Sequence, residues 1–307
     1  MVARMPTFTA PDGTELAYHV SGSVSGSVAG SVAGSLSGSV PGSVPGSGAP
    51  LICLPGGPMQ DSAYLGDLGG LAAVRTVIRL DLRGTGASAM PDDPSSYRCD
   101  RLVEDVEALR IELGLDALDL LGHSAGANLA ALYTARYPER VARLVLATPG
   151  AAAVGLDTTG EERLAAARLR SAEPWFGPAY AALEELAAGR GSAETFQAVA
   201  PFFHGTWDEA ARERHAESHR QRNGEAAGVY GSEGAFQPAA TRAAFAAFDR
   251  PVLVVAGEGD ANTPVPTATA YAELFPKATL AVLAGGGHFP WHDDERWFAE
   301  TVDGFLG

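Results

Sequence analysis

The sequence predicts an α/β protein in which a mainly parallel sheet carries helices on both faces and a helical cap is inserted in the core. After Ala49, short apolar runs alternate with segments of helical periodicity, which is the pattern of parallel strands joined by helices. Between residues 151 and 247 this strand pattern stops, although strands are predicted on both sides of the segment. A chain of 307 residues that is 46% hydrophobic can bury the core that such a fold needs.

The predicted strands are short, are rich in Val, Ile and Leu, and mostly end at glycine or at a polar turn. The first is TELAYHV, residues 14–20. The others, all expected to be buried, are LICL (51–54), TVIRLDL (76–82), LDLL (118–121), RLVLAT (143–148), PVLVVAG (251–257) and ATLAVLAG (278–285).

Helix signals lie between these strands. Asp100 is placed to cap a helix over RLVEDVEALRIEL, residues 101–113, which ends at Gly114. Further helices are expected at residues 125–137 before Pro138, from Pro264 to about residue 275, and at residues 294–306. Residues 151–247 are expected to form helices and loops, and their aromatic side chains are expected mainly to pack in the core of that segment.

One tract departs from this pattern. Residues 22–48 repeat a tetrapeptide of the form Gly-Ser-Val-small that is almost uncharged. Ordering it would cost about 1–2 kcal/mol per residue with little burial in return. A solenoid is disfavoured because one Val in four residues supplies few side chains for stacking. We therefore expect a flexible insertion between the first strand and residues 51–54, which would otherwise be joined as a short hairpin.

These signals divide the chain into three parts. Residues 1–150 are predicted to form the first part of the α/β core, residues 151–247 the helical cap, and residues 248–307 the second part of the core. A helical insertion between two strands of one sheet is expected to lie over the carboxyl ends of the strands, where ligands bind in open α/β sheets.

The charge of the chain excludes several classes of function. There are 22 Lys and Arg residues against 37 Asp and Glu residues, a formal net charge of −15, which repels nucleic acid and anionic membranes. No apolar run reaches the roughly 18 residues of a membrane span. Two cysteines, Cys53 and Cys99, and a start without an apolar signal core predict a reduced, cytoplasmic setting. The oligomeric state is not indicated.

The strongest chemical signal is Gly122-His123-Ser124-Ala125-Gly126, which stands between a predicted strand and a predicted helix. This is the Gly-x-Ser-x-Gly pattern in the context that it requires. The turn is too tight for large neighbours, and it exposes the serine hydroxyl above the sheet. The following helix directs its free N–H groups toward the same place. Ser124 is therefore the candidate nucleophile.

A neutral serine needs a histidine base that is held by a carboxylate. After an elbow of this kind the order along the chain is Ser, then Asp or Glu, then His. Asp260 and His288 each follow a predicted strand, so their loops should meet Ser124 at the carboxyl edge of the sheet. Asp260 is favoured as the acid and His288 as the base.

Three other residues are alternatives for these roles. Glu258 is the alternative to Asp260 but lies closer to the strand end. His292 is expected at the surface, and His123 is expected to pack beside the nucleophile with its side chain directed away from Ser124. We recognise no His-x-x-x-His, Cys-x-x-Cys or paired-carboxylate spacing, so we expect neither a metal nor a cofactor.

With these residues the sequence resembles the α/β-hydrolase family. LDLRGTGAS, residues 80–88, is similar to the Asp-x-Arg-Gly-x-Gly-x-Ser motif of its proline iminopeptidase-like members, in which Asp81 and Arg83 are expected to be scaffold. PGGPM, residues 55–59, stands where these members carry His-Gly-Gly-Pro-Gly. The resemblance implies that the backbone N–H groups of Gly57 and Ala125 form an oxyanion hole.

The resemblance implies a serine hydrolase that cleaves an ester, an amide or an N-terminal peptide bond of a small-molecule or short-peptide substrate. An aminopeptidase of this type would hold the free amine with cap carboxylates, for which the candidates are Glu173, Glu213, Glu225 and Glu233, although exposed cap surface is the favoured interpretation of each. The alternative is a non-hydrolytic member of the fold that binds a ligand or catalyses acyl transfer or cyclisation.

Overall fold

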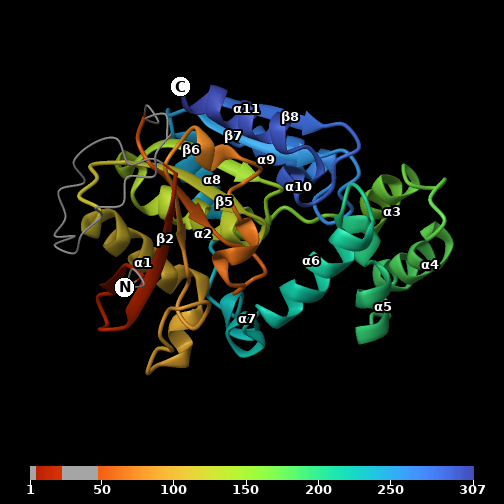
Figure 1. The fold of residues 1–307 in the computed structure, drawn as a ribbon, viewed down its shortest axis with the longest axis horizontal. Coiled ribbons are helices and arrows are strands. Elements are labelled where there is room, and N and C mark those ends of the chain that lie inside the picture. Colours follow the sequence, from red (N-terminus) through yellow and green to blue (C-terminus); the bar gives the residue numbers. More distant parts are fainter. Residues whose placement is uncertain (1–4, 23–47) are drawn as a thin grey trace.

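Eight strands form one sheet in the order β1-β2-β4-β3-β5-β6-β7-β8 (Figure 1). The computed structural model describes residues 5–22 and 48–307. Strands β3 to β8 run parallel to one another, and β1 and β2 are antiparallel additions at one edge. The strands are β1 (Thr7–Thr9), β2 (Glu15–Ser21), β3 (Leu51–Leu54), β4 (Val77–Leu80), β5 (Leu118–His123), β6 (Val141–Ala147), β7 (Val252–Gly257) and β8 (Ala278–Leu283).

The position of β2 corrects one expectation. This strand does not form a hairpin with β3 but pairs with β4, with Tyr18 opposite Leu80. Both edges of β3 are occupied, because Ile52 pairs with Ile78 of β4 on one side and with Leu120 of β5 on the other. Residues 23–47 of the expected flexible insertion lie outside the described part of the chain.

Strand β8 corrects a second expectation. It is an edge strand whose residues, apart from Leu283, are not fully buried. Val282 is 39% exposed. Only β7 pairs with β8 in the described residues, so its outer side chains lack the cover that buries β3, β5 and β7.

The helices join these strands and follow the expected boundaries closely. They are α1 (Cys99–Glu112), α2 (Ala125–Arg136), α3 (Gly160–Arg168), α4 (Phe176–Ala187), α5 (Ala193–Ala198), α6 (Glu209–Arg220), α7 (Gly224–Tyr230), α8 (Pro238–Ala246), α9 (Val265–Ala272), α10 (Pro290–Asp293) and α11 (Glu295–Leu306). Asp100 does not cap α1, because the N-cap is Arg98, and Asp100 instead accepts a hydrogen bond of 2.6 Å from the Arg98 guanidinium.

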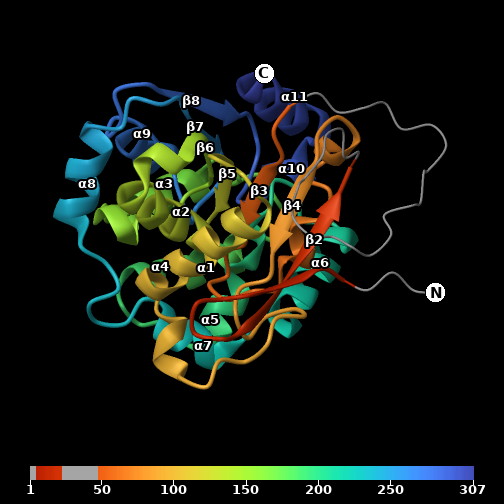
Figure 2. The ribbon, with the colours of Figure 1, turned by 90° about the vertical axis from the view of Figure 1, so that its left-hand side faces the viewer.

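Alternating side chains of the parallel strands supply a core to each face of the sheet. In β3, Ile52 and Leu54 pack with α1 and α2, whereas Leu51 and Cys53 face the side covered by α11 (Figure 2). Such strands are buried on both faces, which explains why they appear in the sequence as continuous apolar runs.

The long segment between β6 and β7 contains no strand in the described structure. Figure 1 shows α3, α4 and α5 together at one side of the sheet. These helices share a small core of their own around Phe202, which Trp175 contacts edge-on at 5.2 Å between ring centroids. Helix α8 belongs instead with the main core, because Phe245 stacks on Phe275 at 4.1 Å.

Asp81 and Arg83 make structural contacts. The carboxylate of Asp81 is fully buried and accepts hydrogen bonds from Ser62 Oγ (2.5 Å) and from the Ala87 N–H (2.9 Å), and it also contacts His19 Nε2 at 2.9 Å. Arg83 donates to both carboxylate oxygens of Asp105, with 2.9 Å between Nε and Oδ2. These contacts join β4 to β2, to the loop after β3, and to α1.

Replacing Arg83 with Met is expected to lower the free energy of unfolding by about 3–5 kcal/mol, because it leaves the fully buried carboxylate of Asp105 without its cation. Urea unfolding followed by circular dichroism measures the change. Arg140, which contacts the exposed Glu139 at 3.6 Å, is the control, and Arg140→Met should cost less than about 1 kcal/mol. Similar losses in the two variants would contradict the buried-pair argument.

Candidate active site

Ser124 stands at the turn between β5 and α2 with a backbone conformation that few non-glycine residues adopt. Its φ is 52° and its ψ is −120°. The turn is held because the Ser124 N–H donates to the Ala147 carbonyl at 3.1 Å and its own carbonyl accepts from the Gly150 N–H at 2.8 Å. Ser124 is only partly buried. Neighbouring strand ends thus hold the hydroxyl in an accessible position at the cost of local strain.

The two glycines of the elbow are required by close packing. A Cβ on Gly126 would lie 2.3 Å from the Leu54 carbonyl oxygen, and a Cβ on Gly122 would lie 2.6 Å from the Gly126 carbonyl oxygen. Any larger residue would push α2 away from β3 and β5. The spacing of the motif therefore reflects the contact between helix and sheet as well as the turn itself.

His288 and Asp260 lie beside Ser124. His288 Nε2 is 2.9 Å from Ser124 Oγ, and His288 Nδ1 is 2.7 Å from Asp260 Oδ2. Asp260 is fully buried in the loop after β7, and its Oδ1 accepts a hydrogen bond of 2.7 Å from the Asn262 N–H. The structure thus brings together three residues that are up to 164 positions apart in the sequence.

The backbone of His288 is fixed from both sides. Its N–H donates to the Phe203 carbonyl at 2.8 Å. Its own carbonyl oxygen accepts from Thr148 Oγ1 and contacts His123 Nε2, each at 2.9 Å. Residues from the helical segment, from β6 and from the elbow therefore determine where the imidazole of His288 lies.

Tyr64 is a residue of the site that sequence reasoning missed. Its hydroxyl accepts a hydrogen bond of 2.6 Å from the Gly56 N–H and lies 2.7 Å from His123 Nδ1. His123 Nε2 faces the His288 carbonyl oxygen, which can only accept, so the neutral ring carries its proton on Nε2 and Nδ1 accepts from the Tyr64 hydroxyl. Burial lowers the pKa of His123 well below its ordinary value, which keeps the ring neutral.

This hydrogen-bond chain joins the Gly56 loop to the backbone of His288 through Tyr64 and His123. His123 therefore packs beside the nucleophile, as the sequence analysis expects, and it also forms part of a polar network. No local pattern marks Tyr64, because it lies on a short turn, Ser62–Leu65, in a loop with no chemical motif of its own.

The Gly56 loop lies directly against the elbow. A Cβ on Gly56 would be 2.8 Å from the His123 carbonyl oxygen and 2.9 Å from Ser124 Cβ, so only glycine allows this approach. Met59 stands where the resembled motif has glycine. It keeps a left-handed backbone, with φ of 59°, and its side chain is fully buried. The glycine pair is thus placed beside Ser124 without the histidine of that motif.

The alternative residues take other contacts. Glu258 accepts from the Gly285 N–H at 2.9 Å. His292 is half-buried rather than exposed, and burial is the main reason that its pKa falls to about 4. Among the four carboxylates considered for binding a substrate amine, Glu173 contacts Arg170 at 3.2 Å, and Glu213, Glu225 and Glu233 are exposed.

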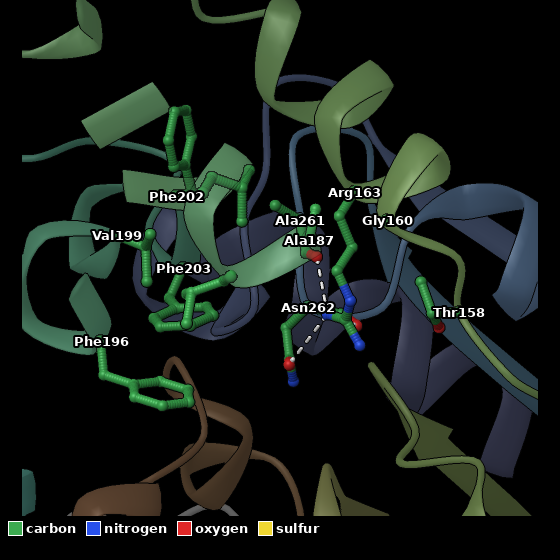
Figure 3. A pocket seen from close by; sticks show the side chains of 12 residues that line it. Thr158, Gly160, Arg163, Ala187, Phe196, Val199, Phe202, Phe203, Ala261 and Asn262 are labelled. Atoms are coloured by element: carbon green, nitrogen blue, oxygen red, sulfur yellow. Dashed lines mark hydrogen bonds between the residues drawn. The ribbon is translucent and has the colours of Figure 1, made fainter. Parts of the chain in front are cut away.

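A cavity of about 410 Å³ is lined by residues next to Asp260 and His288 (Figure 3). Its wall includes Asn262, whose Nδ2 is 3.3 Å from His288 Nε2, and Phe203, whose ring centroid is 6.3 Å from that of His288. The residues around it come from α3 and the turn before it, from α4, from α5 and the turn after it, and from the loop after β7. They are Thr158, Gly160, Arg163, Leu183, Leu186, Ala187, Phe196, Val199, Phe202, Phe203, Ala261 and Asn262.

The expectation that the sequence has no His-x-x-x-His spacing is wrong, because His215 and His219 have it and so do His288 and His292. His215 and His219 form a His-x-x-x-His pair on α6, with 3.2 Å between their Nε2 atoms. In residues 5–22 and 48–307, no group of three or more His, Cys, Asp or Glu side chains is arranged to hold a metal ion. The pair therefore lacks the further protein ligands of a typical metal site.

The parallel sheet, the strained serine at a strand-to-helix turn, and the histidine and aspartate at later strand ends are the features of an α/β-hydrolase enzyme. A family model described as alpha/beta hydrolase fold matches residues 49–295, and the chain belongs to this family. The family and its relatives make the protein a hydrolase.

Several of the proteins that this chain is similar to are proline iminopeptidases. A proline iminopeptidase of Lactobacillus delbrueckii subsp. bulgaricus is 26% identical over 284 residues, which cover 84% of this chain and 90% of the relative. A proline iminopeptidase of Heyndrickxia coagulans is 40% identical over 102 residues, 33% of this chain and 35% of the relative. The crystal structure of a proline iminopeptidase from Mycobacterium smegmatis has a TM-score of 0.69 at 26% identity, covering 98% of this chain and 97% of that one.

No helix in the described ranges combines the length and the apolar character that crossing a bilayer requires.

Proposed function

We propose that this hydrolase is a serine hydrolase that cleaves an ester, an amide or an N-terminal peptide bond through a Ser124-His288-Asp260 triad and an acyl-enzyme. The observation that carries the proposal is the continuous pair of contacts from Ser124 Oγ to His288 Nε2 at 2.9 Å and from His288 Nδ1 to Asp260 Oδ2 at 2.7 Å. This geometry suits a nucleophile, its base and the group that orients the base.

In the first step His288 Nε2 takes the hydroxyl proton of Ser124 as Oγ attacks the substrate carbonyl carbon. The imidazolium then gives this proton to the leaving alcohol or amine, which leaves the acyl group on Ser124. Water repeats the sequence with His288 again as base and releases the acid. Asp260 receives the Nδ1–H throughout, so it fixes the tautomer and stabilises the imidazolium.

The backbone N–H groups of Gly57 and Ala125 are proposed to donate hydrogen bonds to the negative oxygen of each tetrahedral intermediate. Two observations support this. Ala125 begins α2, where backbone N–H groups lack partners within the helix. The Gly56 N–H is already donated to Tyr64, which leaves the next N–H of the same loop, that of Gly57, for the substrate. Each such donor contributes roughly 3 kcal/mol in the transition state.

The helical segment is proposed to act as a cap over this site. The Phe203 carbonyl accepts from the His288 N–H, and helices α3 to α5 form half of the cavity wall. Because α7 and α8 both pack in the main core, we propose that the cap ends before Gly224 rather than at residue 247. The substrate is a small molecule or a short peptide, in keeping with a cavity of about 410 Å³.

A fluorophosphonate probe tests the proposal. The wild-type protein is expected to gain the mass of one probe adduct on Ser124, found by peptide mass spectrometry, and Ser124→Ala is expected to gain none. Circular dichroism of both proteins controls for folding. Equal labelling of the two proteins, or no adduct on the folded wild type, would contradict the triad and favour the alternative of a non-hydrolytic binding protein.

A further inference from the structure

The cavity beside the active site contains one ionisable side chain, that of Arg163 on α3 (Figure 3). One of its nitrogens, Nη1, donates to the carbonyl oxygens of Ala261 (2.9 Å) and Asn262 (2.8 Å). Its Nε and Nη2 have no hydrogen-bond partner among the described residues. These two N–H groups form one edge of the planar guanidinium, which is the edge that binds both oxygens of a carboxylate.

No carboxylate of the described chain neutralises Arg163 within ion-pair distance. The two acidic groups that affect it are both engaged elsewhere. Asp260 is held by His288, and Glu162 accepts hydrogen bonds from the Thr159 backbone N–H (2.7 Å) and hydroxyl (2.9 Å). Burial lowers the pKa of Arg163, which reflects the cost of keeping this cation away from water. An anion in the cavity would offset that cost.

The cation lies close to the reacting groups. Arg163 Nη1 is 3.4 Å from Asn262 Oδ1, and Asn262 Nδ2 is 3.3 Å from His288 Nε2. One amide side chain thus separates the guanidinium from the proposed base. The rest of the wall is largely apolar, with Phe196, Phe203 and Leu186 among its residues. The cavity therefore suits an apolar substrate body with a single negative charge.

We propose that the substrate is an ester or amide that carries a carboxylate, and that Arg163 binds this carboxylate. This proposal rests on the serine hydrolase function proposed above. A free N-terminal amine would instead meet a cation in this cavity. The carboxylates that an aminopeptidase would need are not there, because Glu173, Glu213, Glu225 and Glu233 are outside its wall. The chain as a whole has a net charge of −15, yet the one ionisable side chain in the wall of this cavity is a cation.

Matched esters that differ only in charge test this assignment. One pair is the 4-nitrophenyl ester of terephthalic acid, with one free carboxylate, and the 4-nitrophenyl ester of 4-carbamoylbenzoic acid. The second pair places the charge on the leaving group, as the acetate esters of 4-hydroxybenzoic acid and 4-hydroxybenzamide. In the wild type, kcat/KM for the anionic member of at least one pair should exceed that of its neutral partner by about 10- to 100-fold.

Arg163→Met should remove this preference, and Arg163→Lys, which keeps the charge without the fork, should retain part of it. Because Nη1 also holds the loop of Asp260 and Asn262, the measured quantity is the ratio of kcat/KM within a pair, which a loosened loop alone would not change. Arg168→Met is the control, since Arg168 is exposed on the same helix and outside the cavity wall, and it should leave the ratio as in the wild type.

Three results would overturn the assignment: no preference for the anionic member of either pair, a preference for the neutral members, or an equal loss for both members in Arg163→Met. Each can occur in a protein that hydrolyses the neutral esters and is labelled on Ser124 by fluorophosphonate. Failure of the carboxylate assignment is therefore distinguishable from failure of the serine hydrolase proposal.

Discussion

Replacing Ser124 or His288 with Ala is expected to lower kcat by about 10⁴- to 10⁶-fold, and the double variant should be no slower than the worse of the two. The reason is that the nucleophile and its base act as one unit, so that removing either abolishes the same step. Initial rates on an activated ester, with active enzyme counted by fluorophosphonate titration of the wild type, measure the effect. Multiplicative losses in the double variant would show that the two residues act independently.

The alternative residues supply the controls for this prediction. Asp260→Asn should lower kcat by about 10⁴-fold, because the amide no longer accepts the Nδ1–H and favours the wrong tautomer of His288. Glu258→Gln should leave kcat near the wild-type value, since Glu258 holds only the Gly285 N–H. His292→Gln should do the same if His288 is the base. Loss of activity in either control, with the fold intact, would reassign the acid or the base.

Removing the Tyr64 hydroxyl is expected to lower kcat by about 10- to 100-fold with little change in KM. Tyr64→Phe leaves the Gly56 N–H without its acceptor and His123 Nδ1 without its donor. The loop that carries Gly57 and the backbone of His288 then lose their common anchor, so the oxyanion donor and the base are less well placed in the transition state. Steady-state kinetics separates kcat from KM.

Tyr133→Phe is the matched control for this variant. Tyr133 is fully buried, whereas Tyr64 is partly buried, and its hydroxyl is likewise hydrogen-bonded, 2.8 Å from Glu107, but this partner lies on α1 away from the active site. Both variants should lose on the order of 1 kcal/mol of unfolding free energy, whereas only Tyr64→Phe should lose catalytic rate. If the two variants keep the same kcat, Tyr64 has a structural role alone and does not position the active site.

Local patterns determined much of the fold. The six apolar runs from residue 51 onward all form strands. For β3, β5 and β7 the reason is that a parallel strand buried on both faces needs continuous apolar residues such as Val, Ile and Leu. The break at Pro138 and the elbow at Ser124 were equally clear, since a proline and a tight turn restrict the backbone at the residue itself. The loops of Asp260 and His288 could be placed at one edge because parallel strands all end there.

Pairing and packing could not be predicted in this way. The neighbour of β2 depended on which sheet edge was still free after β3 had paired on both sides. The exposure of β8 depended on the missing neighbour at the other edge within the described sheet. Asp100 is not the helix cap because α1 starts two residues earlier than expected, directly after the turn at residues 94–97.

The sequence by itself determined the fold class and the three residues proposed for the triad, because each of these is marked by a local pattern. Only the tertiary structure decided what surrounds them. Tyr64 contacts His123 across 59 positions, His123 contacts His288 across 165, and Arg163 contacts Ala261 across 98, and no local pattern records such contacts. The distances between side chains and their burial are set only when distant segments pack together. The negative charge proposed for the substrate could therefore be inferred only from the position of Arg163 in the folded cavity.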